Sequence, residues 1–234
     1  MRWFSKKSYQ LTDILLPVSE SLVYTENNYY CDQTLKFGYT QHLGNIKTPY
    51  KVIPNGLIVE DWNLENTCKN KNTFITVMTN DQVRRKGADL ILEVSKEFPD
   101  CIFYIAGSTM IYGVKVLPEN VKCLGQLTPS ELKEYYSSTQ FYLQLSNFEG
   151  FGVAICEAML CKCVPIVSDV NFLPSIVGDS GFVLKKRKKE LLVELFKTAL
   201  LSDTDRLGTL AREKIHQEFP VTKRKEMLIS VLKK

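Results

Sequence analysis

Two glutamates, Glu149 and Glu157, stand eight positions apart around the glycine-rich turn Glu149-Gly150-Phe151-Gly152. Glycine lets a backbone approach a ligand closely, and a helix that begins after this turn presents free N–H groups and a partial positive charge. Such a turn suits an anion or a cluster of hydroxyl groups. Because eight residues are a little more than two helical turns, the two carboxylates would lie on nearly the same face. The pattern therefore indicates a polar ligand site with two carboxylates.

Two apolar segments flank this turn and are predicted to be strands. The first is 141–145 and the second is 164–167, with a short apolar helix through Met159 between them. Strand, glycine turn, helix and strand together make one βαβ unit. The turn would then lie at the carboxyl end of a strand, at the mouth of a ligand-sized opening.

A basic loop earlier in the chain offers cations to the same opening. Arg84, Arg85 and Lys86 come directly before a helix predicted over 87–98. The forked guanidinium of arginine suits phosphate oxygens. Taken by itself, a loop of this kind is more often a solvated basic segment.

Strands alternate with helices through most of the chain, which favours an α/β fold with a Rossmann-like, doubly wound parallel sheet. In an open parallel sheet, ligands bind outside the carboxyl ends of the strands. Four loops leave those ends and are expected to converge on one crevice: 79–86, 107–109, 125–127 and 146–152.

The first part of the chain has a weaker pattern. Residues 13–18 are predicted to form a buried strand, followed by a helix with Ser19 as its N-cap. A short strand over 51–53 ends at Pro54-Asn55-Gly56, a strong turn signal. We place a domain boundary at that turn.

The composition is that of an ordinary soluble globular protein, with 234 residues, 44% hydrophobic and 24% charged. The net charge of +4 permits acidic partners but does not require them. No apolar run approaches the roughly 20 residues of a membrane span, and the start does not have the pattern of a secretory signal. Seven cysteines without framework spacing favour a reducing, cytosolic compartment.

Two local clusters each allow two interpretations. Cys156, Cys161 and Cys163 could bind a metal, but without a fourth ligand at zinc-type spacing we expect them to pack a helix end. The basic run 185–189 is expected to be a solvated loop, with contact to an anionic membrane as the alternative.

The segments EGFG, EAM, SD and LPSIVGDSG, between residues 149 and 181, resemble the E-x7-E region of glycosyltransferase family 4 (glycosyl transferases group 1). These are retaining enzymes of the GT-B fold, and the resemblance extends over most of the chain. It implies that 57–219 is the C-terminal, nucleotide-sugar-binding domain. It also implies that 1–56 is a remnant of the N-terminal acceptor-side domain with a linker, and that 220–234 is a helix packing back toward it.

The resemblance also implies roles for individual residues. Glu149 and Lys86 would be catalytic, Glu149 at the transferred sugar and Lys86 at the diphosphate of the donor. Glu157 would accept hydrogen bonds from the ribose hydroxyls. The remaining donor-binding residues would be Arg84, Arg85, Leu127 beside the base, Gly150, and the backbone N–H groups of Phe151, Gly152 and Val153. No metal or other cofactor is implied, because the nucleotide diphosphate sugar is itself the donor substrate.

Three positions depart from the family pattern. Asn80 stands where a phosphate-binding arginine is common, which puts the phosphate affinity in question unless Arg84 or Arg85 replaces it. Lys162 replaces a glycine after the EAM helix, at a cost of about 1 kcal/mol. The family often has G-x-G in the turn after the second strand, but here Gly107 is followed by Ser108 and Thr109.

We carry two hypotheses on function. The first is the donor-binding part of a retaining glycosyltransferase that moves a sugar from a UDP- or GDP-linked donor to a glycan or lipid-linked acceptor. The second is a non-catalytic nucleotide-sugar-binding module, or one member of a two-chain enzyme whose second chain supplies the rest of the N-terminal domain. A nucleotide-sugar epimerase matches the motif less well. Nucleic acid is not an expected partner, and we expect a cytoplasmic chain with at most peripheral contact at the inner membrane face.

Overall fold

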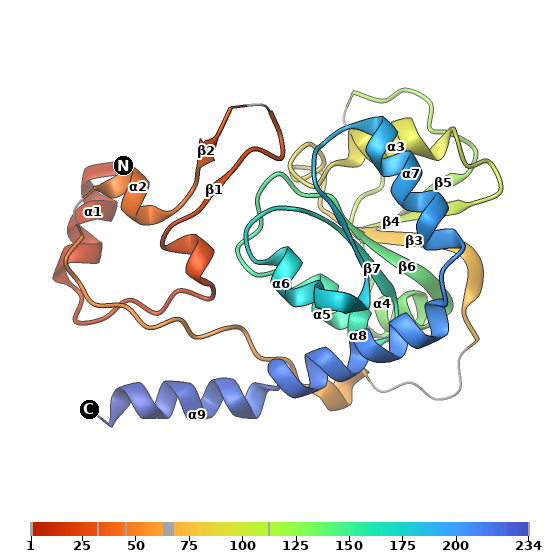
Figure 1. The fold of residues 1–234 in the computed structure, drawn as a ribbon. Helices are drawn as coiled ribbons and strands as arrows, with labels where there is room; N and C mark the ends of the chain where they lie inside the picture. The colour runs from red at the N-terminus through yellow and green to blue at the C-terminus, as the bar shows by residue number, and fades with distance from the viewer. Residues whose placement is uncertain (1, 32, 45, 63–67, 112, 234) are drawn as a thin grey trace.

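A parallel β-sheet forms the centre of the protein in the computed structural model, which describes residues 2–31, 33–44, 46–62, 68–111 and 113–233 (Figure 1). Within these residues the sheet has six strands in the order β5-β4-β3-β6-β7-β8, and every neighbouring pair is parallel. The strands are β3 (Asn70–Val77), β4 (Ile102–Ala106), β5 (Val121–Gly125), β6 (Thr139–Gln144), β7 (Val164–Ser168) and β8 (Phe182–Leu184). The strand order reverses between β3 and β6, so the predicted doubly wound sheet is confirmed.

Helices cover both faces of the sheet. Their bounds are α3 (Ala88–Ser95), α4 (Pro129–Ser138), α5 (Val153–Leu160), α6 (Leu173–Val177), α7 (Lys189–Leu200) and α8 (Thr204–Glu218). Helices α3 and α7 pack together on one face, while α4, α5 and α8 cover the other (Figure 1). A capping box begins α4, because Thr128 Oγ1 accepts from Glu131 N and the Glu131 carboxylate accepts from Thr128 N.

Four phenylalanines explain why the sheet holds α7. Phe74 is in register with Phe103 on one side and Phe141 on the other, and its ring stacks on both at 4.8 Å between centroids. Phe196 of α7 stacks on Phe74 at the same distance. All four side chains are buried. Aromatic stacking adds to the apolar area that this face removes from water.

The turn after α5 shows how one unusual residue is accommodated. Lys162 has φ 60°, the left-handed conformation that glycine adopts most easily, as the sequence predicted. Its carbonyl oxygen lies against Gly208 of α8, where an added Cβ would approach it to 2.5 Å. Gly208 therefore lets α8 pack directly on this turn, and α5 and α8 are close neighbours.

The N-terminal part consists of short elements: α1 (Arg2–Leu11), a 3-10 turn (Glu20–Leu22), β1 (Glu26–Asn27), β2 (Leu35–Lys36), α2 (Tyr39–Leu43) and a 3-10 turn (Val59–Trp62). The strands predicted over 13–18 and 51–53 are wrong as strands. The two segments are extended and meet at one parallel bridge, Leu15 with Tyr50. Lys51 N donates to Leu15 O and Ile53 N donates to Pro17 O, but Pro17 has no N–H to return a bond, so the pairing does not extend beyond this bridge. The helix predicted after Ser19 is reduced to the first 3-10 turn.

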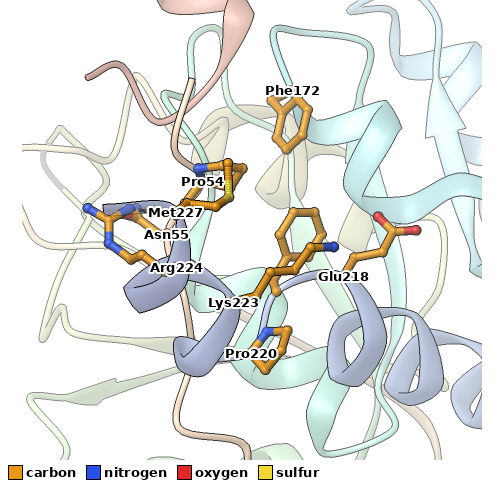
Figure 2. A pocket seen from close by; sticks show the side chains of 9 residues that line it. Pro54, Asn55, Phe172, Glu218, Pro220, Lys223, Arg224 and Met227 are labelled. Atoms are coloured by element: carbon orange, nitrogen blue, oxygen red, sulfur yellow. Dashed lines mark hydrogen bonds between the residues drawn. The ribbon is translucent and has the colours of Figure 1, made fainter. Parts of the chain in front are cut away.

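The chain crosses twice between the N-terminal part and the sheet, at 54–57 and at 219–221. Leu57 N donates to Phe219 O at 2.9 Å, and Val221 N donates to Leu57 O at 2.8 Å, so the crossings lie side by side. The second crossing leads into α9 (Val221–Leu232). Arg224 of this helix donates to the carbonyls of Ile53 and Pro54 at the first crossing. An open pocket of about 310 Å³ lies between the two crossings, with Phe172 and Met227 in its wall (Figure 2).

The basic run 185–189 is not a solvated loop. Arg187 bonds Asp89 at 2.6 Å, lies 5.4 Å from the centre of the Tyr30 ring, and donates its backbone N–H to Tyr29 O at 2.9 Å. Further contacts join Lys185 to Asp169, Lys186 to the carbonyl of Asn28 and Lys189 to Glu97. The run therefore attaches the hairpin formed by β1 and β2 to the sheet domain. The prediction of a solvated loop is wrong.

Cys156, Cys161 and Cys163 are all buried, and Cys163 Sγ donates to the carbonyl of Tyr136 at 3.0 Å. Burial raises the pKa of each thiol, that of Cys161 to about 12. They pack the end of α5 as small apolar groups. No helix among the described residues is long and apolar enough to span a membrane.

Candidate active site

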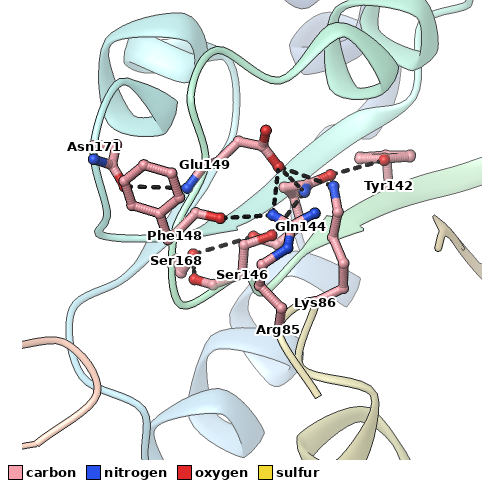
Figure 3. A network of polar contacts seen from close by, with 9 residues as sticks. All are labelled: Arg85, Lys86, Tyr142, Gln144, Ser146, Phe148, Glu149, Ser168 and Asn171. Carbon is pink, nitrogen blue, oxygen red and sulfur yellow. Dashed lines mark hydrogen bonds and ion pairs between the residues drawn. The ribbon is translucent and has the colours of Figure 1, made fainter. Parts of the chain in front are cut away.

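Lys86 and Glu149 come from the loops after β3 and β6, two neighbouring strands at which the strand order reverses. Lys86 Nζ lies 2.9 Å from Glu149 Oε2, and the two side chains are only 11% and 15% exposed (Figure 3). A backbone hydrogen bond also joins the two loops, since Asn147 N donates to Arg85 O at 2.8 Å. The structure therefore brings together the two residues that the sequence predicts as catalytic, although 63 positions separate them.

The Glu149 carboxylate is held through one oxygen. Its Oε2 accepts from Lys86 Nζ and from Gln144 Nε2, both at 2.9 Å, and Arg85 NH1 lies 3.9 Å away. Within the described residues its Oε1 has no hydrogen-bond partner, and Figure 3 shows it pointing away from this cluster. One oxygen is thus fixed and the other is free to meet a ligand.

Gln144 is itself fixed in a buried network. Tyr142 Oη donates to Gln144 Oε1 at 2.9 Å, and Gln144 Nε2 also donates to Ser146 Oγ at 2.8 Å. Ser168 Oγ donates to the carbonyl of Ser146 at 2.6 Å and so joins β7 to the same turn. The side chains of these residues are at most 1% exposed. Buried polar groups of this kind specify one arrangement because each has its partner.

The backbone of the glycine turn is anchored from two sides. Glu149 N donates to Asn171 Oδ1 at 3.1 Å, from the loop after β7. Ser19 Oγ donates to Gly150 O at 2.7 Å, from the N-terminal part. The ring of Phe37 also lies 5.4 Å from that of Phe148. The turn is therefore held between the sheet and residues 19–37.

The start of α5 presents free backbone donors. Gly152 has φ 103°, a left-handed conformation, and α5 begins at Val153. Within the described residues the N–H groups of Phe151, Gly152 and Val153 have no acceptor, which suits an anion or hydroxyl ligand. The Phe151 ring is buried against Phe172 and Phe219, so only its backbone remains for a ligand.

Glu157 lies inside α5 and is half-buried. Burial raises its pKa to about 7, and no described residue forms a hydrogen bond or ion pair with its carboxylate. Both Glu149 and Glu157 act on Tyr142, whose pKa is raised well above 10, first by burial and then by these two carboxylates. Glu157 therefore lies near the cluster without a partner among the described residues, which is typical of a carboxylate in a ligand site.

The predicted cations separate into two kinds. Lys86 and Arg85 belong to the cluster, and Arg85 NH1 also donates to Phe148 O at 2.9 Å. Arg84 is exposed, and no contact places it in the cluster among the described residues. Asn80 accepts a hydrogen bond from Ser108 Oγ, which links the loops after β3 and β4. Asn80 therefore has a structural role in this arrangement.

Leu127 lies further along the carboxyl edge of the sheet, in the loop after β5. It is partly exposed, and Gly125 N donates to Ser108 O at 3.0 Å, which holds this loop beside the loop after β4. Among the described residues no hydrogen bond joins Leu127 to Glu149 or Lys86. Its predicted place beside a base stays a prediction.

Three residues of the site were missed in the sequence: Gln144, Asn171 and Ser19. Gln144 is the polar residue within the apolar segment 141–145, which is a signal that the sequence contains. Asn171 lies two positions after the SD motif and has φ 50°, which is unusual for a residue other than glycine. Ser19 carried no signal of contact with Gly150, because only the tertiary fold brings them together.

The fold and the site define a Rossmann-like domain with a cation and two carboxylates at its switch point, the place where such domains bind nucleotides. The sequence model of the family described as glycosyl transferases group 1 matches residues 62–216. The chain belongs to this family. The resemblance seen in the sequence is therefore confirmed.

Curated relatives agree with this membership. O-antigen chain mannosyltransferase B of Escherichia coli is 36% identical over 63 residues, which are 27% of this chain and 16% of that protein. The gpi3 subunit of phosphatidylinositol N-acetylglucosaminyltransferase from Schizosaccharomyces pombe is 22% identical over 178 residues, 71% of this chain and 39% of that protein. The matched segments thus span well under half of these relatives.

Solved structures show the same fold at low identity. Sucrose-phosphate synthase from Thermosynechococcus elongatus superposes with a TM-score of 0.80 at 18% identity, over 99% of this chain and 60% of that chain. HepE from Anabaena, in complex with UDP-glucose, gives 0.77 at 16% identity, over 99% of this chain and 67% of that one. The described chain therefore has the C-terminal domain of a GT-B glycosyltransferase and part of the N-terminal domain.

Proposed function

We propose that this chain is the donor-binding part of a retaining glycosyltransferase, which transfers a sugar from a nucleotide diphosphate sugar to a glycan or lipid-linked acceptor. The observation that carries the proposal is the Lys86–Glu149 pair at the switch point of the sheet, with 2.9 Å between Nζ and Oε2. In this pair the Lys86 ammonium would bind a phosphate of the donor, and the Glu149 carboxylate beside it would bind the sugar. Cations at a departing phosphate stabilise the charge that develops as the glycosidic bond breaks.

The diphosphate would lie against Lys86 and Arg85 and against the free N–H groups before α5. Lys86 is poorly exposed and close to Arg85, so the loop concentrates positive charge where a leaving phosphate needs it. In this proposal the two side chains and the helix start neutralise the phosphates, and no metal cofactor takes part. Arg84 would contribute only through its charge, because it is exposed.

The sugar and the ribose would each meet one carboxylate. Glu149 Oε1 is free to accept from sugar hydroxyls or to face developing positive charge at the anomeric carbon. Glu157 is half-buried without a partner, and two ribose hydroxyls would supply the hydrogen bonds that its ionised form lacks. The base would then lie toward Leu127, along the carboxyl edge of the sheet.

The names of similar proteins support a UDP- or GDP-linked donor. HepE was solved in complex with UDP-glucose, and one curated relative, 37% identical over 57 residues, is named GDP-mannose:cellobiosyl-diphosphopolyprenol alpha-mannosyltransferase. These names also include lipid-linked acceptors. We extend them to this chain as a proposal for its substrate classes.

A second candidate function is a partner chain or binding module that holds a nucleotide sugar for another polypeptide. One observation favours it. Several curated relatives are named as subunits of phosphatidylinositol N-acetylglucosaminyltransferase. The second chain would supply acceptor-binding residues opposite the donor site. The chain would then act in the cytoplasm, with peripheral contact at the inner membrane face where its acceptor is lipid-linked.

Calorimetric titration of the purified chain with UDP, GDP, ADP and their common sugar conjugates tests the donor site. We expect one nucleotide to bind, and Glu157→Ala to weaken it about tenfold because a charged hydrogen bond to the ribose is lost. Glu134→Ala, a change on the surface of α4, is the matched control and should leave the affinity within twofold. Absence of binding for every nucleotide would refute the proposal.

Transfer assays then separate the two candidate functions. A chain that binds the nucleotide sugar and transfers the sugar by itself to a lipid-linked or glycan acceptor is the enzyme. Binding without transfer, with activity restored by a second polypeptide, supports the two-chain alternative.

A further inference from the structure

We propose that Gln144 is a positioning residue, which holds Glu149 Oε2 and so keeps Glu149 Oε1 directed at the donor sugar. This inference rests on the proposed function, because it assigns the free oxygen to the sugar. It adds a residue that the glycosyltransferase motif does not include, since Gln144 lies at the end of β6, before the glycine turn.

The geometry around Gln144 supports this role (Figure 3). Its Nε2 donates to Glu149 Oε2 at 2.9 Å and to Ser146 Oγ at 2.8 Å, while its Oε1 accepts from Tyr142 Oη at 2.9 Å. Both ends of the amide are thus bonded, which fixes the side chain in one orientation. Gln144 is 1% exposed, so bulk solvent has little access to these bonds.

Lys86 also holds Glu149 Oε2, but a donor would change that contact. The diphosphate carries more negative charge than one carboxylate and would attract the Lys86 ammonium, which is a flexible point charge on a long stem. The neutral amide of Gln144 is not attracted in this way, and its own partners keep it in place. When Lys86 turns to the phosphate, Gln144 is the remaining anchor of Glu149.

The anchor also makes rotation of Glu149 unfavourable. If the carboxylate turned away, Gln144 Nε2 would lose one acceptor in a buried place, and a buried donor without its partner is costly. The orientation of the free oxygen is therefore set before the sugar arrives. Such preorganisation is what a site for a developing charge requires.

The Gln144→Leu variant tests the inference in calorimetric titrations of the full chain with a nucleotide and with its sugar conjugate. The measured quantity is the ratio of the two dissociation constants, which reports the contribution of the sugar. We expect this ratio to change about tenfold, or about 1.4 kcal/mol. The affinity for the nucleotide alone should stay within twofold, because Gln144 acts through Glu149, which contacts only the sugar in this proposal.

The matched control is Gln140→Leu, the same substitution at the other end of β6. Gln140 bonds Thr204 and the backbone of Asn72, away from the cluster, so its loss should leave the ratio unchanged. Gln144→Glu serves as a second variant if Gln144→Leu does not fold. It keeps the shape but sets a like charge against Glu149, and we expect the ratio to change by at least as much.

A double-mutant cycle separates positioning from a general structural effect. If Gln144 acts through Glu149, then Gln144→Leu should have no further effect on the ratio in a Glu149→Gln background. Additive effects would overturn the inference, as would an unchanged ratio in Gln144→Leu. Equal affinities for nucleotide and sugar conjugate in the wild type would also overturn it, while absence of nucleotide binding would refute the proposed function itself.

Discussion

Ser19 Oγ lies 2.7 Å from the carbonyl oxygen of Gly150 and donates a hydrogen bond to it, across 131 positions of sequence. Ser19 is fully buried, and Leu22 of the same segment lies against Gly150. The hydrogen bond therefore ties the N-terminal part directly to the turn that carries Glu149. A displacement of the N-terminal part would therefore shift the turn and with it Glu149 at the proposed sugar site.

Ser19→Ala should lower the free energy of unfolding by about 1–2 kcal/mol, because the partly buried carbonyl of Gly150 loses its donor. Urea denaturation measures this change. Ser138→Ala removes a comparable hydroxyl that bonds within α4, and as a control it should cost less than about 0.5 kcal/mol. Equal stabilities of wild type and Ser19→Ala would contradict the structural role of this contact.

Lys86→Ala should weaken binding of a nucleoside diphosphate by tenfold or more, because a charge-assisted phosphate contact is lost. Arg84→Ala should change it less than threefold, since Arg84 is exposed and outside the cluster. Calorimetric titration at two salt concentrations measures both, and the effect of Arg84 should shrink at high salt through screening. Similar losses in the two variants would contradict the assignment of Lys86 to the phosphates.

Glu157 should make the stability of the fold depend on pH. Burial raises its pKa to about 7 in the folded state, whereas an exposed glutamate titrates near pH 4.3. The folded state therefore binds more protons between these values. The contribution of Glu157 to stability is complete below about pH 4.3 and is lost as the pH rises toward and through 7.

Glu157→Gln should remove this part of the pH dependence and make the protein more stable than wild type at pH 8. Urea unfolding of both proteins between pH 5 and pH 8 provides the measurement. Parallel stability curves for the two proteins would show that the carboxyl is not buried as described.

Arg187→Ala should loosen the hairpin of residues 26–36. The Arg187 side chain forms an ion pair with Asp89 and lies over the Tyr30 ring, and its backbone N–H donates to Tyr29 O. We expect faster hydrogen exchange and faster proteolysis within the hairpin, while the sheet stays protected. Lys197→Ala, which removes an exposed ion pair with Glu194, is the control. An unchanged exchange pattern in Arg187→Ala would contradict the docking role of the basic run.

Lys162→Gly should stabilise the protein by about 0.5–1 kcal/mol, because glycine adopts φ 60° without the cost that Lys162 carries. Thermal unfolding compares the two proteins. Lys188→Gly is a contrasting substitution: Lys188 has an ordinary extended backbone, so glycine there should be destabilising. A destabilising Lys162→Gly would mean that the lysine side chain has a packing role.

The sequence by itself determined the elements whose signals are local. The capping box of Thr128 and Glu131 follows from side-chain chemistry within one turn, and the apolar strands followed by helices specify a doubly wound sheet. The glycine turn that carries Glu149 and the helix that carries Glu157 also follow from the local sequence. These predictions succeed because helix and strand periodicity depend on neighbours a few positions away.

The tertiary structure alone decided which side chains meet. The contacts of Glu149 with Lys86 and Gln144 depend on two loops reaching the same strand ends and on the rotamers there. The basic run around Arg187 has the pattern of a solvated charge block, and its partner Asp89 is 98 positions away, so no local signal indicates their contact. Segments 13–18 and 51–53 have the composition of strands, and the fold brings them side by side, but Pro17 has no N–H to donate and they share one bridge in place of a ladder.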